Sequence, residues 1–247
     1  MKKNLFKRAI SLVIAFMMIL SGTQVLFAVA IPPEQQIELT KTATPVDGEE
    51  NTYTIQLSVK GKDIDTGKKV DVILVIDNSA SMFTSKYDGK TLGKITEEAA
   101  KAFVNGVLTP ENGSNIRVAV VKYGEEAYAR NFNGSGSWIN WVDSLSDKMV
   151  YTSDKADAEK AIESATIETK DEGTNTEGGF LMAKKVADVK RTGAESIVIF
   201  MTDGLPTYRY NSKGNAVEDY YGNQTSKDEL NEAIAAAQAL NSGSKIY

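Results

Sequence analysis

No cysteine and no histidine occurs among the 247 residues of this chain. Without cysteine there is no disulfide framework, no thiolate nucleophile and no cysteine-bound zinc, and without histidine there is no imidazole base. Any metal ion must therefore be held by oxygen atoms, which suits Mg²⁺, Ca²⁺ or Mn²⁺ and disfavours zinc and copper. The chain also lacks a basic block, and its 28 basic and 33 acidic residues give a net charge of −5. This balance offers no electrostatic reason to expect nucleic acid binding.

Residues 1–30 have the layout of a secretory signal peptide. Basic residues among the first eight precede an apolar run from Ala9 to Leu20, and small residues follow at Ala28-Val-Ala30. The run is shorter than the roughly 20 apolar residues that a membrane-spanning helix needs, and no second stretch qualifies as a membrane span. We therefore expect cleavage and export, with an uncleaved signal anchor as the alternative.

Residues 31–66 are predicted to form a short β-rich segment. Ile37 to Thr42 and Thr52 to Val59 have the character of strands, the second with strict alternation of polar and apolar residues. Pro45-Val-Asp-Gly48 between them has the composition of a turn. Two strands cannot make a core alone, so we expect this segment to pack on another part of the protein or to belong to a module that is completed beyond residue 247.

Residues 67–247 are predicted to form an α/β domain with a doubly wound, mainly parallel sheet and helices on both faces. Apolar runs rich in β-branched residues indicate strands buried on both faces. These runs are Val72–Ile76, Ile116–Val121 and Ile197–Met201. Apolar residues at helical spacing predict helices. These cover Ile95–Val107, Ala156–Ala165, Gly179–Val189 and Leu230–Leu240.

The two ends of this domain have further predicted features. Tyr128 to Phe132 is expected to return as one antiparallel edge strand. Lys245-Ile-Tyr247 resembles the start of another buried strand. We therefore expect the domain to be truncated at its C-terminal end, as a fragment of a longer protein.

Three groups of oxygen-bearing side chains are predicted at one edge of the sheet. The first apolar run ends in Asp77-Asn-Ser-Ala-Ser81, whose alternate residues point the same way when the chain is extended. Gly173-Thr-Asn-Thr176 lies just before a predicted helix, and Thr202-Asp-Gly204 follows the third apolar run. Because the ligand crevice of an open parallel sheet lies at the carboxyl ends of its strands, we expect the groups to share one site.

Each group also has an interpretation without function. The first would provide a turn and a helix cap, Thr174 with Glu177 would form a capping box, and Asp203-Gly204 would be an ordinary turn. These alternatives stay open for each motif taken singly. The order of the motifs and their common edge favour a single site.

Together the three groups resemble the metal-ion-dependent adhesion site of von Willebrand factor type A domains, over about Asp71 to Tyr247. The resemblance implies the Rossmann-like fold of that family. It also implies a metal site formed by Asp77, Ser79, Ser81, Thr174 and Asp203. By this resemblance the three hydroxyls bind the metal, and the two aspartates act directly or through water. Thr176 is the alternative to Thr174, and Ala80 stands where the family commonly has glycine.

The resemblance implies binding rather than catalysis. Neutral hydroxyls leave a divalent ion short of negative charge, so it keeps an exchangeable water that a carboxylate from outside replaces. We expect Mg²⁺, with Mn²⁺ or Ca²⁺ as alternatives. The expected partner is a protein, such as a host matrix or surface protein, that offers an Asp or Glu side chain. With no histidine and both aspartates engaged by the metal, no group takes a proton from water, so we do not expect an enzyme.

The signal peptide, the absence of cysteine and the Lys-Thr-Ala-Thr-Pro segment are similar to those of secreted Gram-positive surface proteins, pilus-tip adhesins among them. We therefore expect a secreted or cell-surface adhesion module. Two other classes stay open: a structural pilus or surface-fibre subunit, and a metal-assisted hydrolase. An intracellular metal-chelatase subunit conflicts with the signal peptide.

Two insertions are candidates for partner contact. Tyr208 to Gly222 contains four tyrosines, and Trp138 and Trp141 follow a Gly- and Ser-rich stretch. The alternatives are that the tyrosines pack within their loop and that the tryptophans, spaced i to i+3, pack a short helix on the sheet. Acidic residues elsewhere, such as Asp228-Glu229, are expected on the solvated first turns of helices.

Overall fold

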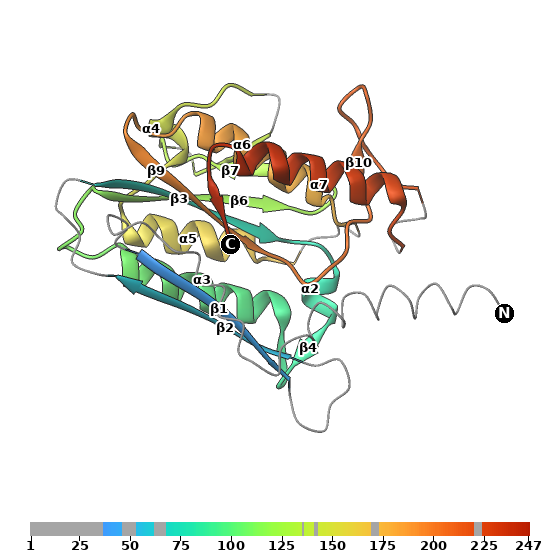
Figure 1. Cartoon of the computed structure of the whole chain (residues 1–247), viewed down its shortest axis with the longest axis horizontal. Coiled ribbons are helices and arrows are strands. Elements are labelled where there is room, and N and C mark those ends of the chain that lie inside the picture. The colour runs from blue at the N-terminus through green and yellow to red at the C-terminus, as the bar shows by residue number, and fades with distance from the viewer. Residues whose placement is uncertain are drawn as a thin grey trace. The chain divides into compact units, whose positions relative to one another are not determined.

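The structure is a computed structural model that describes residues 37–45, 53–61, 68–134, 136–140, 143–168, 173–219 and 224–247 (Figure 1). The chain divides into two compact units, Met1–Ile64 and Asp65–Tyr247. In the first unit, β1 (Ile37–Pro45) pairs antiparallel with β2 (Tyr53–Gly61). Both strands expected in this segment are confirmed. The expected signal peptide lies outside the described residues.

The second unit contains a six-stranded sheet with the order β12-β9-β3-β6-β7-β8. The central strand β3 (Lys69–Asp77) pairs parallel with β6 (Ile116–Tyr123) and with β9 (Ala194–Met201). At one edge, β12 (Lys245–Ile246) pairs parallel with β9. The expected α/β fold with a mainly parallel sheet is confirmed. Beyond Lys69, every residue of β3 is buried, which explains why its sequence shows no alternation.

The other side of the sheet has one more antiparallel strand than expected. β7 (Ala127–Arg130) pairs antiparallel with β6, as predicted, but β8 (Trp138–Asn140) pairs antiparallel with β7 and forms the edge. Trp138 therefore lies on a strand, and the interpretation of a short helix at this residue is wrong. Its indole Nε1 donates a hydrogen bond to the Ser164 hydroxyl at 3.1 Å. Trp141 lies outside the described residues.

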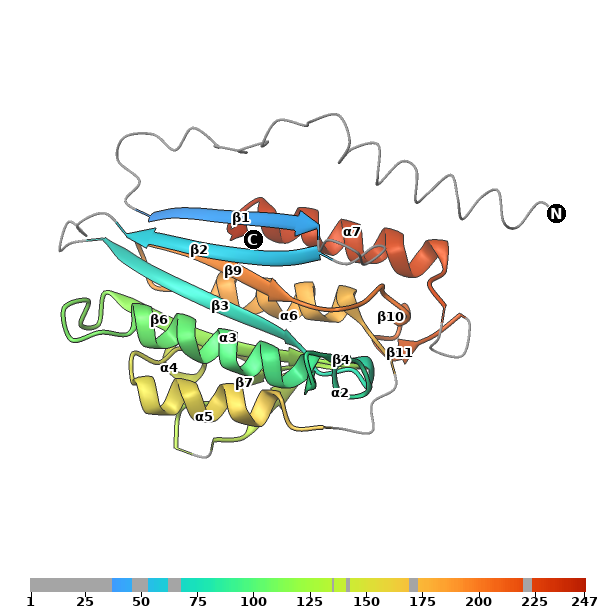
Figure 2. The ribbon, with the colours of Figure 1, turned by 90° about the horizontal axis from the view of Figure 1, so that it is seen from below.

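Helices cover both faces of this sheet (Figure 2). α3 (Leu92–Val107) and α5 (Lys155–Ala165) lie on one face, and α6 (Thr176–Asp188) and α7 (Lys227–Asn241) lie on the other. All four predicted helices are confirmed. Each begins one to three residues before its predicted start, where the side chain of a polar N-cap residue accepts a backbone N–H. The caps are Thr91, Asp154, Asn175 and Ser226.

Short elements complete the unit. Two helical turns and two small hairpins occur in the connections. They are α2 (Ser81–Thr84), α4 (Asp147–Val150), β4 (Lys86–Tyr87) with β5 (Lys90–Thr91), and β10 (Arg209–Tyr210) with β11 (Ala216–Val217). In the described part of the chain, no helix has both the length and the apolar character needed to cross a membrane.

The register of the parallel strands brings distant segments to the same edge. Asp77 lies opposite Tyr123 of β6, and Ile76 lies opposite Met201 of β9. The residues after β3 and β9 therefore leave the sheet side by side. The amino end of α6 reaches this edge too, because Asn175 N donates a hydrogen bond to Gly124 O at 2.7 Å.

A buried ion network lies near the opposite end of β3. The carboxylate of Asp71 is fully buried and accepts hydrogen bonds of 2.9–3.0 Å from the guanidinium groups of Arg117 and Arg191. Burial alone would raise the pKa of Asp71. The hydrogen bonds from both arginines and the charge of Arg117 outweigh this effect, so the pKa lies below its ordinary value. The ionised carboxylate therefore joins β3 to β6 and to the segment that precedes β9.

Asp71→Asn should lower the free energy of unfolding by about 3–5 kcal/mol near neutral pH, because it leaves two guanidinium groups without their buried partner. Since the pKa of Asp71 is lower in the folded state, its contribution is complete above about pH 4 and is lost as the pH falls through the folded value. Urea titrations at several pH values should show that the difference in free energy of unfolding between wild type and variant becomes smaller in acid.

The matched control is Asp188→Asn, which removes an exposed carboxylate paired with Lys184 at 2.7 Å. It should cost less than about 1 kcal/mol. A loss of unfolding free energy in Asp71→Asn that stays constant across the acid range would contradict this account of the network.

Candidate metal centre

The first group of predicted site residues forms a tight turn at the end of β3. Asp77 and Ser79 are almost fully buried, each with 1% exposure. Ser79 N donates a hydrogen bond to Asp77 Oδ1 at 2.9 Å. Asn78 is anchored on both sides, by its N–H to Tyr123 O at 2.7 Å and by its side-chain amide to Ile167 O at 2.9 Å. The turn is therefore held by β6 and by the residues that follow α5.

The third group meets the first through side-chain oxygens. The hydroxyls of Ser79 and Ser81 lie 3.1 Å apart, and Ser81 Oγ donates to Asp203 Oδ1 at 3.0 Å. Thr202 Oγ1 donates to Asp77 Oδ2 at 2.6 Å. Four of the five predicted residues are thus joined by hydrogen bonds between segments more than 120 residues apart.

Thr174 approaches the same edge from the amino end of α6. Its hydroxyl lies 4.0 Å from the position that a Cβ on Gly204 would occupy. Its backbone is fixed by Thr207, whose N–H donates to Thr174 O at 2.9 Å and whose hydroxyl accepts from Thr174 N at 3.0 Å. Among the described residues, no hydrogen bond joins the Thr174 hydroxyl to the other four predicted residues.

The capping-box interpretation of Thr174 is wrong. Asn175 is the N-cap of α6, because its side-chain oxygen accepts from Gly178 N at 2.8 Å. Glu177 instead accepts from Tyr210 N at 2.7 Å. Thr174 therefore has no capping role in this helix.

The alternative residue, Thr176, has a different environment. Its hydroxyl is buried and lies beside the Tyr123 phenol. Tyr123 OH in turn donates to Asp77 Oδ2 at 3.2 Å. Thr176 therefore lies on the Tyr123 side of Asp77, whereas Thr174 lies beside the loop that carries Asp203.

The electrostatics of the site leave its negative charge without a cationic partner. Burial raises the pKa of Asp77, hydrogen bonds from Ser79 and Thr202 partly oppose this, and the nearby Asp203 carboxylate raises it further. No Lys or Arg forms an ion pair with Asp77 or Asp203 within the described ranges. A bound cation would relieve both the burial cost and the mutual repulsion of the two carboxylates.

The donor set fits a hard divalent ion. Three hydroxyls and two carboxylates supply only oxygen, the ligand atom that Mg²⁺ and Ca²⁺ prefer. The oxygen separations of 3.0 and 3.1 Å around Ser81 are close to the roughly 3.0 Å edge of an octahedron with metal–oxygen bonds of about 2.1 Å. Within the described residues, no group of three or more Asp or Glu side chains could hold a metal ion. Hydroxyls and water are therefore the further oxygen ligands that a centre here would use.

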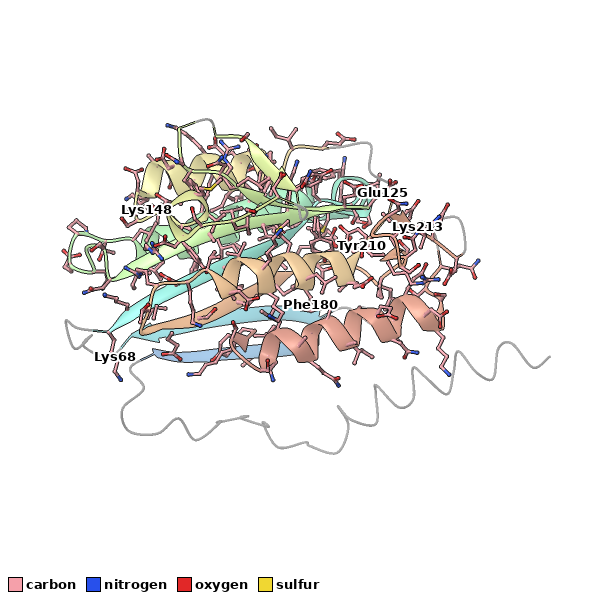
Figure 3. All side chains as sticks on the ribbon, turned by 90° about the horizontal axis from the view of Figure 1, so that it is seen from above. Lys68, Glu125, Lys148, Phe180, Tyr210 and Lys213 are labelled. Atoms are coloured by element: carbon pink, nitrogen blue, oxygen red, sulfur yellow. The ribbon has the colours of Figure 1, made fainter. Side chains whose placement is uncertain are left out.

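The loop after Asp203 is fastened to the fold by its tyrosines. Tyr210 is buried at the end of α6 (Figure 3), and its hydroxyl accepts from Ala127 N at 3.3 Å. The Tyr208 ring lies directly over Gly173. These two tyrosines thus pack against residues outside their own loop. Tyr220 and Tyr221 lie outside the described residues.

Glu229 anchors the far end of this loop, and its expected solvated position is wrong. It is fully buried, and its carboxylate accepts from Asp219 N at 3.0 Å and from Ser226 N at 2.5 Å. The capping box between Ser226 and Glu229 could be found in the sequence, as Ser-x-x-Glu. The contact with Asp219 could not, because it depends on how the loop folds back.

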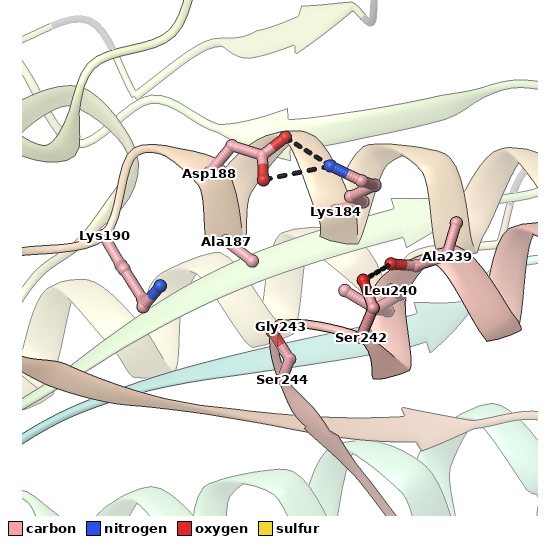
Figure 4. Close-up of a pocket in the computed structure, with 9 residues that line it drawn as sticks. All are labelled: Lys184, Ala187, Asp188, Lys190, Ala239, Leu240, Ser242, Gly243 and Ser244. Carbon is pink, nitrogen blue, oxygen red and sulfur yellow. Dashed lines mark hydrogen bonds and ion pairs between the residues drawn. The ribbon is translucent and has the colours of Figure 1, made fainter.

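A small cavity lies away from this centre, where α6 and α7 end (Figure 4). Its volume is about 70 Å³, which accommodates about two water molecules. Lys184 and Asp188 form an ion pair on its wall. Because α6 and α7 end just before β9 and β12 begin, the cavity lies at the opposite end of the strands from Asp77.

Residues 72–205 match the family model of the von Willebrand factor type A domain. The Minor fimbrium subunit Mfa5 of Porphyromonas gingivalis is 28% identical over 201 residues, covering 78% of this chain and 14% of that protein. The chain thus spans about a seventh of the length of this curated relative. A solved structure of the vWF domain of the type V pili tip protein Mfa5 is 27% identical, with a TM-score of 0.43, covering 58% of this chain and 40% of the other. The pilus adhesin SpaC from Lactobacillus rhamnosus GG is 22% identical, with a TM-score of 0.46, covering 79% of this chain and 23% of that one.

Gly173→Ala should lower the free energy of unfolding by about 1–3 kcal/mol, because a Cβ at this residue would lie 2.2 Å from the Tyr208 ring. The matched control is Gly106→Ala near the end of α3, where a Cβ meets nothing within 4 Å. The control should be neutral or stabilise by up to about 1 kcal/mol, since Ala favours helix. Urea denaturation measures both, and equal effects would contradict the close packing of Tyr208 on Gly173.

Proposed function

The chain belongs to the von Willebrand factor type A domain family, and on that premise we propose that it is a cell-surface adhesion module that binds an acidic side chain of a partner protein through a divalent metal ion. The metal would be held by Asp77, Ser79, Ser81, Thr174 and Asp203. The observation that carries the proposal is the continuous contact from Ser79 through Ser81 to Asp203, with Asp77 behind it. Oxygen atoms from the first and third motifs lie within 3.1 Å of each other there.

A role at the cell surface is supported by the relative found among curated proteins. That protein is named a fimbrium subunit, which agrees with adhesion or assembly of a surface fibre. The chain covers a small part of that relative, so the activity of the whole protein is part of the proposal. Export through the predicted signal peptide would deliver the domain to the same compartment.

The gradient of exposure across the site supports an approach from solvent. Asp77 and Ser79 are buried, Ser81 is half-buried, and Asp203 is exposed. A bound Mg²⁺ supplies positive charge and a coordination position for an outside ligand. Asp203 and Ser81 border the open side, so an Asp or Glu side chain would enter there, past Gly204, whose lack of a side chain keeps the approach clear.

The same groups are poorly suited to hydrolysis. The Asp77 carboxylate already accepts hydrogen bonds from Ser79, Tyr123 and Thr202. The chain contains no histidine, and Asp203 accepts from Ser81. Asp77 is thus engaged by donors of the protein, and Asp203 would be engaged by the metal ion, which favours ligation over catalysis.

A structural role in a surface fibre is the second candidate, because the curated relative is named as a fimbrium subunit. Such a role would be independent of the metal. Fibre assembly in cells that express Asp77→Ala would separate the two: assembly unchanged with adhesion lost supports the metal-dependent function, and both unchanged supports the structural one.

Isothermal titration of the purified chain with MgCl₂ should show one binding event, which Ser79→Ala weakens by at least about tenfold, because one oxygen ligand is removed. The matched control is Ser244→Ala, which removes a buried hydroxyl from a comparable serine pair, with Ser196 at 2.8 Å. Ser196 lies in β9 opposite Asp71, and Ser244 directly precedes β12, so the pair is far from Asp77 and the control should bind Mg²⁺ like wild type. Equal titrations for both variants and wild type, or no binding at all, would overturn the metal site.

Carboxylate ligation is tested with the chain loaded with Mn²⁺ and with acetate as the probe. Water-proton relaxation reports water bound to Mn²⁺, so acetate should lower the relaxation rate as its carboxylate displaces that water. Acetamide has the same shape without the charge and should leave the rate unchanged. Equal responses to acetate and acetamide would argue against binding of an acidic partner through the metal.

A further inference from the structure

Both lone-pair directions of one Asp77 oxygen are used inside the protein. Oδ2 accepts from Thr202 Oγ1 at 2.6 Å and from Tyr123 OH at 3.2 Å. A carboxylate oxygen has two lone-pair sites, so these donors fill Oδ2. Oδ1 accepts from Ser79 N and is the oxygen left for a metal ion or its water. Asp77 therefore presents one oxygen to the site.

The Tyr123 phenol is fixed in this position by its surroundings. Tyr123 is fully buried, its ring lies 5.2 Å from that of Phe200, and a Cβ on Gly179 would lie 3.0 Å from it. Its backbone is opposite Asp77 in the β3–β6 ladder. Burial raises the pKa of Tyr123 well above its ordinary value, as does the Asp77 charge, so the phenol keeps its proton and donates.

Thr202, the residue that follows β9, completes the arrangement. Its hydroxyl donates to Asp77 Oδ2 and accepts from Gly204 N at 3.1 Å. This hydroxyl therefore links the orientation of Asp77 to the turn that carries Asp203. Two donors, one at the end of β6 and one directly after β9, thus act on the same oxygen.

We infer that Tyr123, together with Thr202, is a positioning residue that restricts Asp77 to one-oxygen coordination and so makes the site select a small octahedral ion over Ca²⁺. The inference rests on the proposed function, because it concerns the same metal site. Ca²⁺ takes six to eight oxygens and often binds carboxylates through both oxygens, whereas Mg²⁺ requires near-ideal octahedral geometry with single-oxygen contacts. Without its two donors, Oδ2 would let Asp77 turn and supply a second oxygen. A second oxygen raises the affinity for Ca²⁺ and not for Mg²⁺.

Tyr123→Phe removes the phenol hydroxyl and keeps the ring packed against Phe200. Titrations of the purified chain with MgCl₂ and with CaCl₂ should show Mg²⁺ affinity lower by about tenfold or more, as is typical when a group that orients a ligand is lost. Ca²⁺ affinity should stay the same or rise. The measured quantity is the ratio of the two affinities, which a general loss of stability would not shift in favour of one ion.

The matched control is Tyr151→Phe. Tyr151 is also buried, and its hydroxyl donates to Val186 O at 3.1 Å, beside the Asp71 network rather than the metal site. This variant should lose stability like Tyr123→Phe and keep the wild-type ratio of Mg²⁺ to Ca²⁺ affinity. Thr202→Val removes the other donor to Oδ2 and should shift the ratio in the same direction as Tyr123→Phe.

The outcomes separate this inference from the proposed function. If wild type binds Mg²⁺ and both Tyr123→Phe and Thr202→Val keep its ratio within about twofold, the inference is wrong and the metal site stands. If wild type binds no Mg²⁺, the proposed function fails first and the inference with it. If circular dichroism shows that Tyr123→Phe does not fold, the ratio of Mg²⁺ to Ca²⁺ affinity in Thr202→Val decides whether the inference is right.

Discussion

The parallel pairing of β3 with β6 and β9 is the constraint on which the candidate centre depends. Each strand delivers its following residues to the same edge, and the register sets Asp77 opposite Tyr123 and Ile76 opposite Met201. Loops alone could not hold side chains from three distant segments at hydrogen-bonding distance, because each would have to lose its conformational freedom separately. A buried sheet fixes the loop ends, so only short turns remain to be ordered.

Much of this architecture could be predicted from sequence because its signals are local. A strand buried on both faces must be apolar throughout, so the runs at β3, β6 and β9 are visible without knowledge of their neighbours. The helical spacing of apolar residues can likewise be seen within each segment by itself, so the four helices could be predicted. The meeting of Asp77 with Asp203 also follows from topology, since the carboxyl ends of parallel strands share an edge.

The features that sequence did not predict depend on contacts between distant residues. β8 is only three residues long and exists because it pairs with β7, and Trp138 carries no local sign of that partner. Glu229 occupies a helix start, where acidic side chains are usually solvated, yet the loop that ends at Asp219 folds over it. The role of Tyr123 is hidden for the same reason: within its strand it is one more apolar residue, and only the register brings its hydroxyl to Asp77.

Two aspartates of β3 show how the same residue type is stabilised in opposite ways. Asp71 and Asp77 lie on one strand, six residues apart and therefore on one face, and both are almost fully buried. Asp71 is paired with two arginines and its pKa is lowered, whereas the described donors to Asp77 are all neutral, Asp203 is nearby, and the pKa of Asp77 is raised. Burying a carboxylate without a positive partner costs several kcal/mol, so within the described chain Asp77 carries a cost that Asp71 does not. A cation held between Asp77 and Asp203 would remove that cost at the end of the strand where the described residues supply no arginine, and this charge balance is the physical reason to look for a ligand there.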